Sequence, residues 1–410
     1  MDVLEDDFKD EEEWMMLPSY YEFQNSTKIL SGKNALENIT YELKGLGASR
    51  PILLSDKVLE KIGSLQNVID AMASTGMEPG AVYTDIPSDS SVTVVNKIGV
   101  VYKEVGCDSI IAVGGGSVID TAKGVEMLVS QGVKDLMELQ GCESMTRGNH
   151  VPFIAVPTTS GTGSEMTLVA VIKNIEKSVK MEFISNYLLP DAAVLDPRMT
   201  ATLPPKTTAS TGFDALCHAI EAYSCNQKNP LSDAYATAAI KLVVENLEDA
   251  VRDGKNTKAR LAMANASTMA GAAFSNSMVG MVHAIGHALG GVCKVPHGDA
   301  MTILLPFCML YNYKKLGDIY GELLLYLEGP EVYAQTPADK RGEEAIKSVR
   351  RLERRLHKMS GLPMTLKEAK VDRKDFDAVA RTALNDGAML VNPAAVEFDD
   401  VIMVLNQAYE

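Results

Sequence analysis

The chain has 410 residues, of which 46% are hydrophobic and 23% charged, and its formal net charge is −15. This length exceeds what one hydrophobic core serves, so we expect two domains, and the composition is that of a soluble globular protein. The acidic balance argues against nucleic acid as a partner, because phosphates need a basic face. No apolar run is long enough to predict a membrane span.

The first 18 residues are interpreted as an acidic N-terminal extension. Residues 1–13 carry eight acidic side chains and one lysine, a composition that predicts a solvated tail. A signal peptide would instead be basic and then apolar. No CxxC pair is present among the six cysteines, which are Cys107, Cys142, Cys217, Cys225, Cys293 and Cys308. We therefore expect a cytoplasmic protein with reduced, mostly buried thiols.

Short apolar runs alternate with helical stretches from about residue 25 to residue 200. The runs lie in PILLSD (51–56), AVYTDIPSD (81–89), DSIIAVGGGS (108–117) and VPFIAVPTTSGTGSE (151–165). Such runs predict the strands of a parallel sheet that is covered on both faces. Ligands of such sheets bind at the carboxyl ends of the strands. We assign residues 19–204 to this dinucleotide-binding α/β domain.

Two loops at predicted strand ends have the composition of phosphate-binding loops. In IIAVGGGSVIDTAKG, three glycines separate a strand from a helix that Ser117 and Asp120 are expected to cap. Bare glycines and a helix N-terminus favour anions, although a tight turn without a ligand is the alternative. PTTSGTGSE (157–165) adds hydroxyls that suit a pyrophosphate or a ribose. Neither GxxxxGK(S/T) nor GxGxxG occurs, which disfavours a P-loop kinase.

Asp56 ends the strand predicted at PILLSD. A carboxylate at that place can accept hydrogen bonds from an adenosine ribose and repels a 2′-phosphate, which favours NAD over NADP. An ordinary turn at the end of a strand explains the aspartate equally well.

Beyond VLDPRMTATLPP (194–205) nearly the whole chain has helical periodicity. One helix is expected over 231–254, with Ser232 as its cap and Gly254 as its end. Another is expected over 342–363, ending with Gly361 and Pro363. We assign residues 205–410 to an all-helical domain.

Four of the six histidines fall in the helical domain between residues 218 and 297. Asp214 and His218 are four residues apart, as are His283 and His287, and His297 lies in a Pro-His-Gly turn. A helix that is apolar all round is buried, so its imidazoles need partners. For any single histidine, an ordinary hydrogen bond is the alternative. The whole set predicts a metal site, and spacing alone would pair His283 with His287.

The motifs GGGSxxDxAK (Gly114 to Lys123), PTTSGTGSE, GxDALxHAxEAY (Gly212 to Tyr223) and HAxGHxLGG…PHG (His283 to Gly298) occur in this order. Over about residues 20 to 410 the chain resembles the iron-containing (group III) alcohol dehydrogenase family. The fold implied is dehydroquinate synthase-like, with an N-terminal parallel-sheet dinucleotide-binding domain and a C-terminal helical metal-binding domain. The complete Asp/His/His/His set counts against the maleylacetate reductase branch.

The resemblance also implies roles for single residues. The metal ligands would be Asp214, His218, His283 and His297, and His287 would be the non-ligand, catalytic histidine near the nicotinamide. The cofactor contacts would be Asp56, Gly115, Gly116, Ser117, Thr158, Thr159, Thr162 and Lys180. One departure is Pro87-Ser88-Asp89, where many members have Asn-Pro after the proline.

The function implied is an NAD-dependent dehydrogenase that interconverts a small primary alcohol and its aldehyde by hydride transfer. The metal would be Fe²⁺, or Zn²⁺, Mn²⁺ or Co²⁺, since all accept these ligands. His287 would relay a proton or order the substrate pocket. A related polyol dehydrogenase for glycerol or a propanediol, and a catalytically silent metal- or nucleotide-binding protein, are the alternatives. A homodimer or larger homo-oligomer is expected from the resemblance.

Overall fold

A computed structural model describes residues 18–141, 145–176 and 179–410. Its main sheet has six strands, all parallel, in the order β1-β8-β5-β4-β2-β3. The strands are β1 (Lys28–Ser31), β2 (Pro51–Leu54), β3 (Ala81–Tyr83), β4 (Ser109–Gly114), β5 (Phe153–Pro157) and β8 (Ala192–Leu195). The predicted parallel sheet is therefore confirmed, and β2 to β5 lie inside the four apolar runs.

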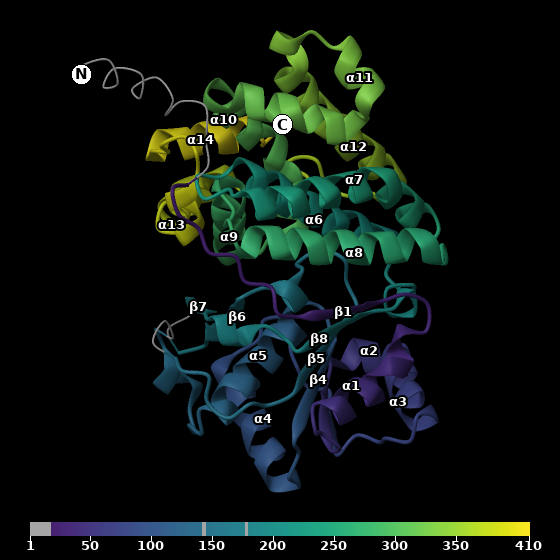
Figure 1. Ribbon diagram of the computed structural model, residues 1–410. Helices are drawn as coiled ribbons and strands as arrows, with labels where there is room; N and C mark the ends of the chain where they lie inside the picture. The colour runs from purple at the N-terminus through teal and green to yellow at the C-terminus, as the bar shows by residue number, and fades with distance from the viewer. Residues whose placement is uncertain (1–17, 142–144, 177–178) are drawn as a thin grey trace, which may run out of the picture.

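Helices cover both faces of this sheet, as Figure 1 shows. Side chains alternate between the faces along a strand. Ile110 and Ala112 of β4 pack with α4 (Val92–Val105) and α5 (Gly116–Ser130). Ile111 and Val113 pack with α1 (Ile39–Gly45) and α3 (Ser64–Ser74). Burial on both faces explains why the strand sequences are uniformly apolar. The short helix α2 (Lys57–Lys61) follows β2 directly.

An antiparallel hairpin of β6 (Val169–Asn174) and β7 (Val179–Ile184) lies beside α5 and was not predicted. Lys123 of α5 holds the start of this hairpin through hydrogen bonds. The fully buried Lys123 Nζ donates to the carbonyl and the hydroxyl of Thr167 and to the carbonyl of Val169, each at 2.8 Å. Burial lowers the pKa of Lys123 to about 8.

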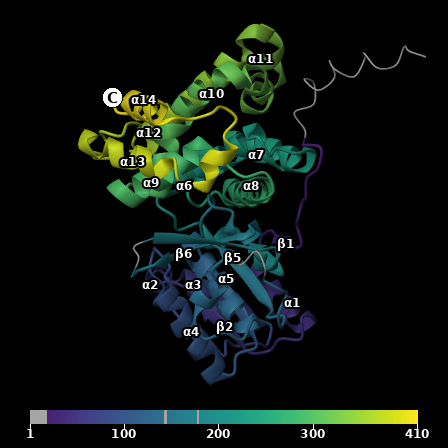
Figure 2. The same ribbon diagram turned by 90° about the vertical axis from the view of Figure 1, so that its left-hand side faces the viewer.

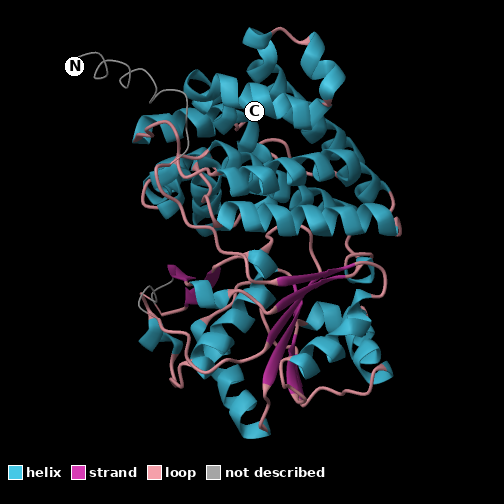
Figure 3. Cartoon of the chain, in the orientation of Figure 1, coloured by secondary structure: helices cyan, strands magenta, loops and turns pink. Residues whose placement is uncertain are grey.

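The rest of the chain is helical and lies beyond the carboxyl ends of the strands (Figures 2 and 3). Its helices are α6 (Pro205–Ser224), α7 (Pro230–Arg252), α8 (Thr257–Ser275), α9 (Met281–Cys293), α10 (His297–Glu328), α11 (Pro330–Gln335), α12 (Arg341–Ser360), α13 (Phe376–Ala383) and α14 (Phe398–Gln407). None of the described helices is long and apolar enough to cross a membrane. The expected pairing of an α/β part with a helical part is confirmed.

The domain limits stay predictions. The acidic extension assigned to residues 1–18 lies, apart from its last residue, outside the described residues. The division at residues 204 and 205 coincides with the start of α6 at Pro205.

Two predicted helix starts are wrong by a few residues. The cap of α7 is Asn229 rather than Ser232, because Asn229 Oδ1 accepts from Ser232 N and Ser232 Oγ accepts from Asn229 N, each at 3.0 Å. This reciprocal pair places Ser232 at the third helical position. The cap of α5 is Gly115 in extended conformation, so Ser117 lies inside the helix. The end of α12 at Gly361 is as predicted, with φ of 69°.

The loop after β5 is fastened directly onto α8. Gly163 has φ of +59°, and a Cβ there would lie 2.6 Å from the Ser267 carbonyl oxygen and 2.7 Å from Gly271 Cα. Thr268 Oγ1 also donates to Glu165 Oε1 at 2.7 Å. Two glycines thus allow this loop, at the carboxyl edge of the sheet, to touch the helical part of the chain.

Candidate metal and cofactor site

Three helices bring the four predicted metal ligands together. Asp214 and His218 lie one turn apart on α6, His283 lies on α9, and His297 is the first residue of α10. Asp214 Oδ1 lies 3.8 Å from His218 Nδ1, 3.8 Å from His283 Nε2 and 3.3 Å from His297 Nε2. One ligand atom from each residue lies within 4.8 Å of those of the other three.

This cluster fits a single divalent cation. Bonds of 2.0–2.2 Å place the ligands of a tetrahedral ion roughly 3.4 Å apart, close to the separations seen. Asp214 Oδ1, His218 Nδ1 and His283 Nε2 are buried and have no hydrogen-bond partner among the described residues. Buried polar atoms are costly without a partner. A shared cation would satisfy all three atoms at once.

Electrostatics favour an ionised carboxylate on Asp214, next to the neutral imidazoles of His218 and His297. Burial opposes the charge on Asp214, but the three surrounding histidines outweigh it and hold the pKa of Asp214 well below its usual range. Burial lowers the pKa of His218 to about 3 and also lowers that of His297. For His283, the effect of burial is outweighed by the negative charges of Glu221 and Asp214, which raise its pKa to about 9. The carboxylate therefore supplies negative charge at the point where a cation would lie.

His287 does not belong to the four-residue cluster. Its Nδ1 lies 2.9 Å from Asp386 Oδ2, and its ring centroid lies 5.9 Å from that of His283. The side chain of His287 is 39% exposed. Although burial opposes ionisation of Asp386, the hydrogen bond from His287 lowers the pKa of that carboxyl. His287 and the equally exposed His297 thus form the open side of the cluster. On another side of the cluster, the ring of Phe274 stacks on the ring of His218, with 4.2 Å between the two ring centroids.

The glycine loop and the threonine loop lie against each other. A Cβ at Gly115 would lie 3.2 Å from Thr159 Oγ1, and a Cβ at Gly116 would lie 3.1 Å from Thr162 Cγ2. Thr158 N donates to the Gly114 carbonyl at 3.0 Å. The two predicted phosphate-binding loops therefore form one surface at the carboxyl ends of β4 and β5, next to the N-terminus of α5.

Ser117 and Asp120 do not form the predicted capping box. The Ser117 hydroxyl donates to the Ser88 carbonyl. Asp120 instead accepts from Ser164 Oγ at 2.7 Å and from Val171 N at 3.1 Å. Asp120 therefore ties α5 to the threonine loop and to β6.

Asp56 and Lys180 both have partners within the chain. Asp56 Oδ1 accepts from Val58 N and Leu59 N at 2.8 and 2.9 Å and caps α2. Both bonds use one oxygen, so the cap does not exclude a contact to a ribose. Lys180 of β7 pairs with Asp89 Oδ1 at 3.0 Å, and Asp89 lies in the segment that departs from the family pattern.

Two family models match the chain. The iron-containing alcohol dehydrogenase model matches residues 26–197, and the C-terminal model of the Fe-containing alcohol dehydrogenase family matches residues 208–409. The chain belongs to the iron-containing alcohol dehydrogenase family. The expected class of enzyme, an oxidoreductase acting on CH–OH groups, and the resemblance are thereby confirmed.

Similar proteins in this family match along nearly their whole length. The 1,3-propanediol dehydrogenase of Klebsiella pneumoniae is 35% identical over 384 residues, covering 92% of this chain and 96% of that protein. The NAD-dependent methanol dehydrogenase of Bacillus methanolicus is 33% identical over 377 residues, covering 92% and 97%. A crystal structure of 1,3-propanediol oxidoreductase superposes with a TM-score of 0.89 and 33% identity, covering 95% of this chain and 100% of that one.

Two acidic residues at the centre of this iron-containing alcohol dehydrogenase were missed in the sequence. Glu221 lies 2.5 Å from His283 Nδ1, and Asp386 contacts His287. Glu221 could have been found, because it stands three residues after His218 in the mostly apolar stretch ALCHAIEAY. Asp386 precedes the short helix Gly387–Val391 in a polar turn that carries no comparable signal.

Proposed function

We propose that this chain is an NAD-dependent, divalent-metal-dependent dehydrogenase that interconverts a small primary alcohol and its aldehyde. The observation that carries the proposal is the cluster of three buried atoms on Asp214, His218 and His283 that have no hydrogen-bond partner among the described residues. Asp214, His218, His283 and His297 would hold Fe²⁺, or Zn²⁺, Mn²⁺ or Co²⁺. The cofactor would lie on the surface that the glycine and threonine loops form.

When bound, the metal polarises the substrate oxygen and NAD accepts the hydride. On one side of this centre the apolar Phe274 ring covers the ring of His218 and would shield it from water. The other side is open at His287 and His297. A carboxylate only accepts hydrogen bonds, so the Asp386 contact fixes the hydrogen of His287 on Nδ1. Nε2 of His287 is then the atom that can take up or return the substrate proton.

NAD is proposed over NADP because Asp56 closes the end of β2 with a carboxylate, which repels a 2′-phosphate. The methanol dehydrogenase relative is named as NAD-dependent. A polyol dehydrogenase acting on a propanediol is the second candidate, favoured by the likeness to 1,3-propanediol dehydrogenase. We also propose a cytoplasmic homo-oligomer, with the five described cysteines as free thiols.

Purified apoprotein, loaded separately with each of the four metals, tests this function. Each form is incubated with NAD or NADP and a panel of primary alcohols, glycerol and propanediols, and NAD(P)H absorbance is followed. We expect turnover with NAD and at least one metal. Metal binding without turnover on any substrate would instead indicate a silent binding protein, and preference for a diol would select the polyol dehydrogenase.

Replacing His287 by glutamine separates a catalytic role from a ligand role. We expect His287→Gln to lower kcat about a hundredfold, the usual scale of a lost proton-transfer group, while the metal content stays that of the wild type. Asp386→Asn keeps an acceptor for His287 Nδ1 and should show a smaller loss with a changed pH profile of kcat. Metal analysis and steady-state kinetics measure both effects. Loss of metal from His287→Gln would show that His287 is a ligand.

Asp89 is expected to weaken cofactor binding. The hydrogen bond from Lys180 lowers the pKa of Asp89, so Asp89 carries a negative charge and pairs with the lysine proposed to contact the cofactor. Asp89 follows Ser88, whose carbonyl accepts from Ser117 at the start of α5. Asp89→Asn should tighten NADH binding about two- to fivefold, the scale of one exposed ion pair. Fluorescence titration with NADH measures the change. Asp249→Asn, which removes a similarly exposed partner of Arg252 on α7, is the control. Unchanged or weaker binding in Asp89→Asn would contradict the prediction.

A further inference from the structure

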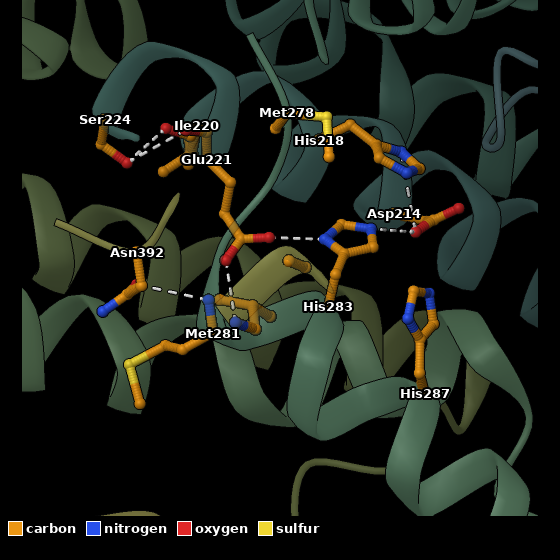
Figure 4. Close-up of polar contacts among 12 residues, drawn as sticks. Asp214, His218, Ile220, Glu221, Ser224, Met278, Met281, His283, His287 and Asn392 are labelled. Atoms are coloured by element: carbon orange, nitrogen blue, oxygen red, sulfur yellow. Dashed lines mark hydrogen bonds and ion pairs between the residues drawn. The ribbon is translucent and has the colours of Figure 1, made fainter. Parts of the chain in front are cut away.

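Glu221 of α6 receives two hydrogen bonds from α9 with its two carboxylate oxygens (Figure 4). Oε2 lies 2.5 Å from His283 Nδ1, and Oε1 accepts from Val282 N at 2.8 Å. Glu221 is 6% exposed and His283 is 2% exposed. Both hydrogen bonds are therefore shielded from solvent, and breaking either one would leave a buried polar group without a partner, at a large cost in free energy.

The close approach of α9 to Glu221 depends on Gly280. A Cβ at Gly280 would lie 3.0 Å from Glu221 Oε1 and 3.0 Å from Asn392 Oδ1. Asn392 Oδ1 accepts from Met281 N at 3.3 Å. Two acceptors from distant parts of the chain thus receive the first N–H groups of α9. Only Glu221 also reaches the imidazole.

The tautomer of His283 follows from this contact. A carboxylate offers only acceptors, so the one hydrogen that the ring keeps when a metal binds its other nitrogen is on Nδ1. The lone pair is then on Nε2, the atom that faces Asp214 at 3.8 Å and has no hydrogen-bond partner among the described residues. In the opposite tautomer, the lone pair of Nδ1 would face the carboxylate of Glu221, so two acceptors would meet. The N–H group at Nε2 would then point toward the metal position.

We propose that Glu221 is a positioning residue that fixes the tautomer and the ring orientation of His283 for metal binding. The inference rests on the proposed function only in taking the four-residue cluster as the metal site. Partners of this kind orient ligands and raise their basicity, and their loss usually weakens metal binding 10- to 100-fold.

A second metal between Cys217, Glu221 and His283 does not explain the arrangement. Ligand atoms of these three residues do lie within 4.8 Å of one another. Both oxygens of Glu221 already accept hydrogen bonds.

Glu221→Gln tests the proposal because an amide has one acceptor where two donors converge. Whichever way it is turned, its NH₂ group faces either Val282 N–H or His283 Nδ1–H. We expect Zn²⁺ to dissociate 10- to 100-fold faster to a chelator, and the visible spectrum of the Co²⁺ form to change. Glu221→Asp keeps two acceptors on a shorter side chain, so its Zn²⁺ dissociation rate should lie between those of Glu221→Gln and the wild type. This variant takes the place of Glu221→Gln in the test if Glu221→Gln does not fold.

Asn392→Ala is the matched control. This variant removes the acceptor for Met281 N at the start of α9 but leaves the Glu221–His283 contact in place. It therefore shows how much of the change in Zn²⁺ release comes from destabilising the N-terminus of α9 alone. The melting temperature of each apoprotein is measured beside its Zn²⁺ dissociation rate. Equal dissociation rates in Glu221→Gln and wild type, or equally fast release from Asn392→Ala, would overturn the role of Glu221. A wild-type protein that binds no divalent metal would overturn the proposed function, and the role of Glu221 with it.

Discussion

Asp214→Asn is expected to yield a folded protein that has lost most of its divalent metal and about a thousandfold of its turnover. A thousandfold corresponds to about 4 kcal/mol in the barrier. Asp214 is the only carboxylate of the four-residue cluster, and its Oδ1 faces three imidazole nitrogens at 3.3–3.8 Å. Asparagine keeps the shape but removes the one charge that offsets the dication. Metal analysis and kcat with saturating NAD and substrate measure the effect.

Asp196→Asn is the control for Asp214→Asn. Asp196 is also buried, but its carboxylate pairs with Arg198 at 2.7 Å, caps the short helix Pro197–Met199 and lies outside the four-residue cluster. It should lower the melting temperature and leave the metal content unchanged. A wild-type metal content in Asp214→Asn, with full activity, would show that the ligand assignment is wrong.

Sequence patterns predict the central part of the fold better than its edges. β2, β4 and β5 are buried on both faces, so their sequences are unbroken apolar runs with few alternatives. The edge strand β1, KILS, is largely exposed and has no such run. The β6–β7 hairpin was missed because β7, VKMEFI, alternates apolar with charged residues and is largely exposed. The position of the hairpin also depends on Lys123, which contacts residues over 40 positions away.

The candidate site shows the same limit. Two pairs at helical spacing, Asp214 with His218 and His283 with His287, were visible in the sequence, but spacing could not separate His287 from the ligand cluster. The structure separates it through Asp386, which is 99 residues away. Glu221 contacts His283 across 62 residues. Such partners are set by the packing of α6, α9 and the C-terminal segment, which no local pattern contains.

Glu126 of α5 is a buried acid that lies outside the site. It is 9% exposed, and its Oε2 has no hydrogen-bond partner among the described residues. Burial, helped by the nearby charge of Asp191, raises the pKa of Glu126 to about 8. An unfolded glutamate has a pKa of about 4.3. The folded chain therefore holds this proton over several pH units in which the unfolded chain has released it.

Glu126→Gln is expected to stabilise the protein increasingly as the pH rises from 5 to 8. Below the unfolded pKa both states are protonated, and the folded state suffers no penalty. Between the two pKa values the wild type loses up to about 1.4 kcal/mol per pH unit, or about 5 kcal/mol in all, and the loss levels off above the folded pKa. Glutamine stays neutral throughout, so its advantage in melting temperature should be near zero at about pH 4, already measurable at about pH 5, and about 5–10 °C at about pH 8. Thermal unfolding of both proteins at several pH values, with the exposed Glu104→Gln on α4 as control, measures the difference. An advantage that does not change with pH would mean that Glu126 is ionised in the folded protein and that another group compensates its charge.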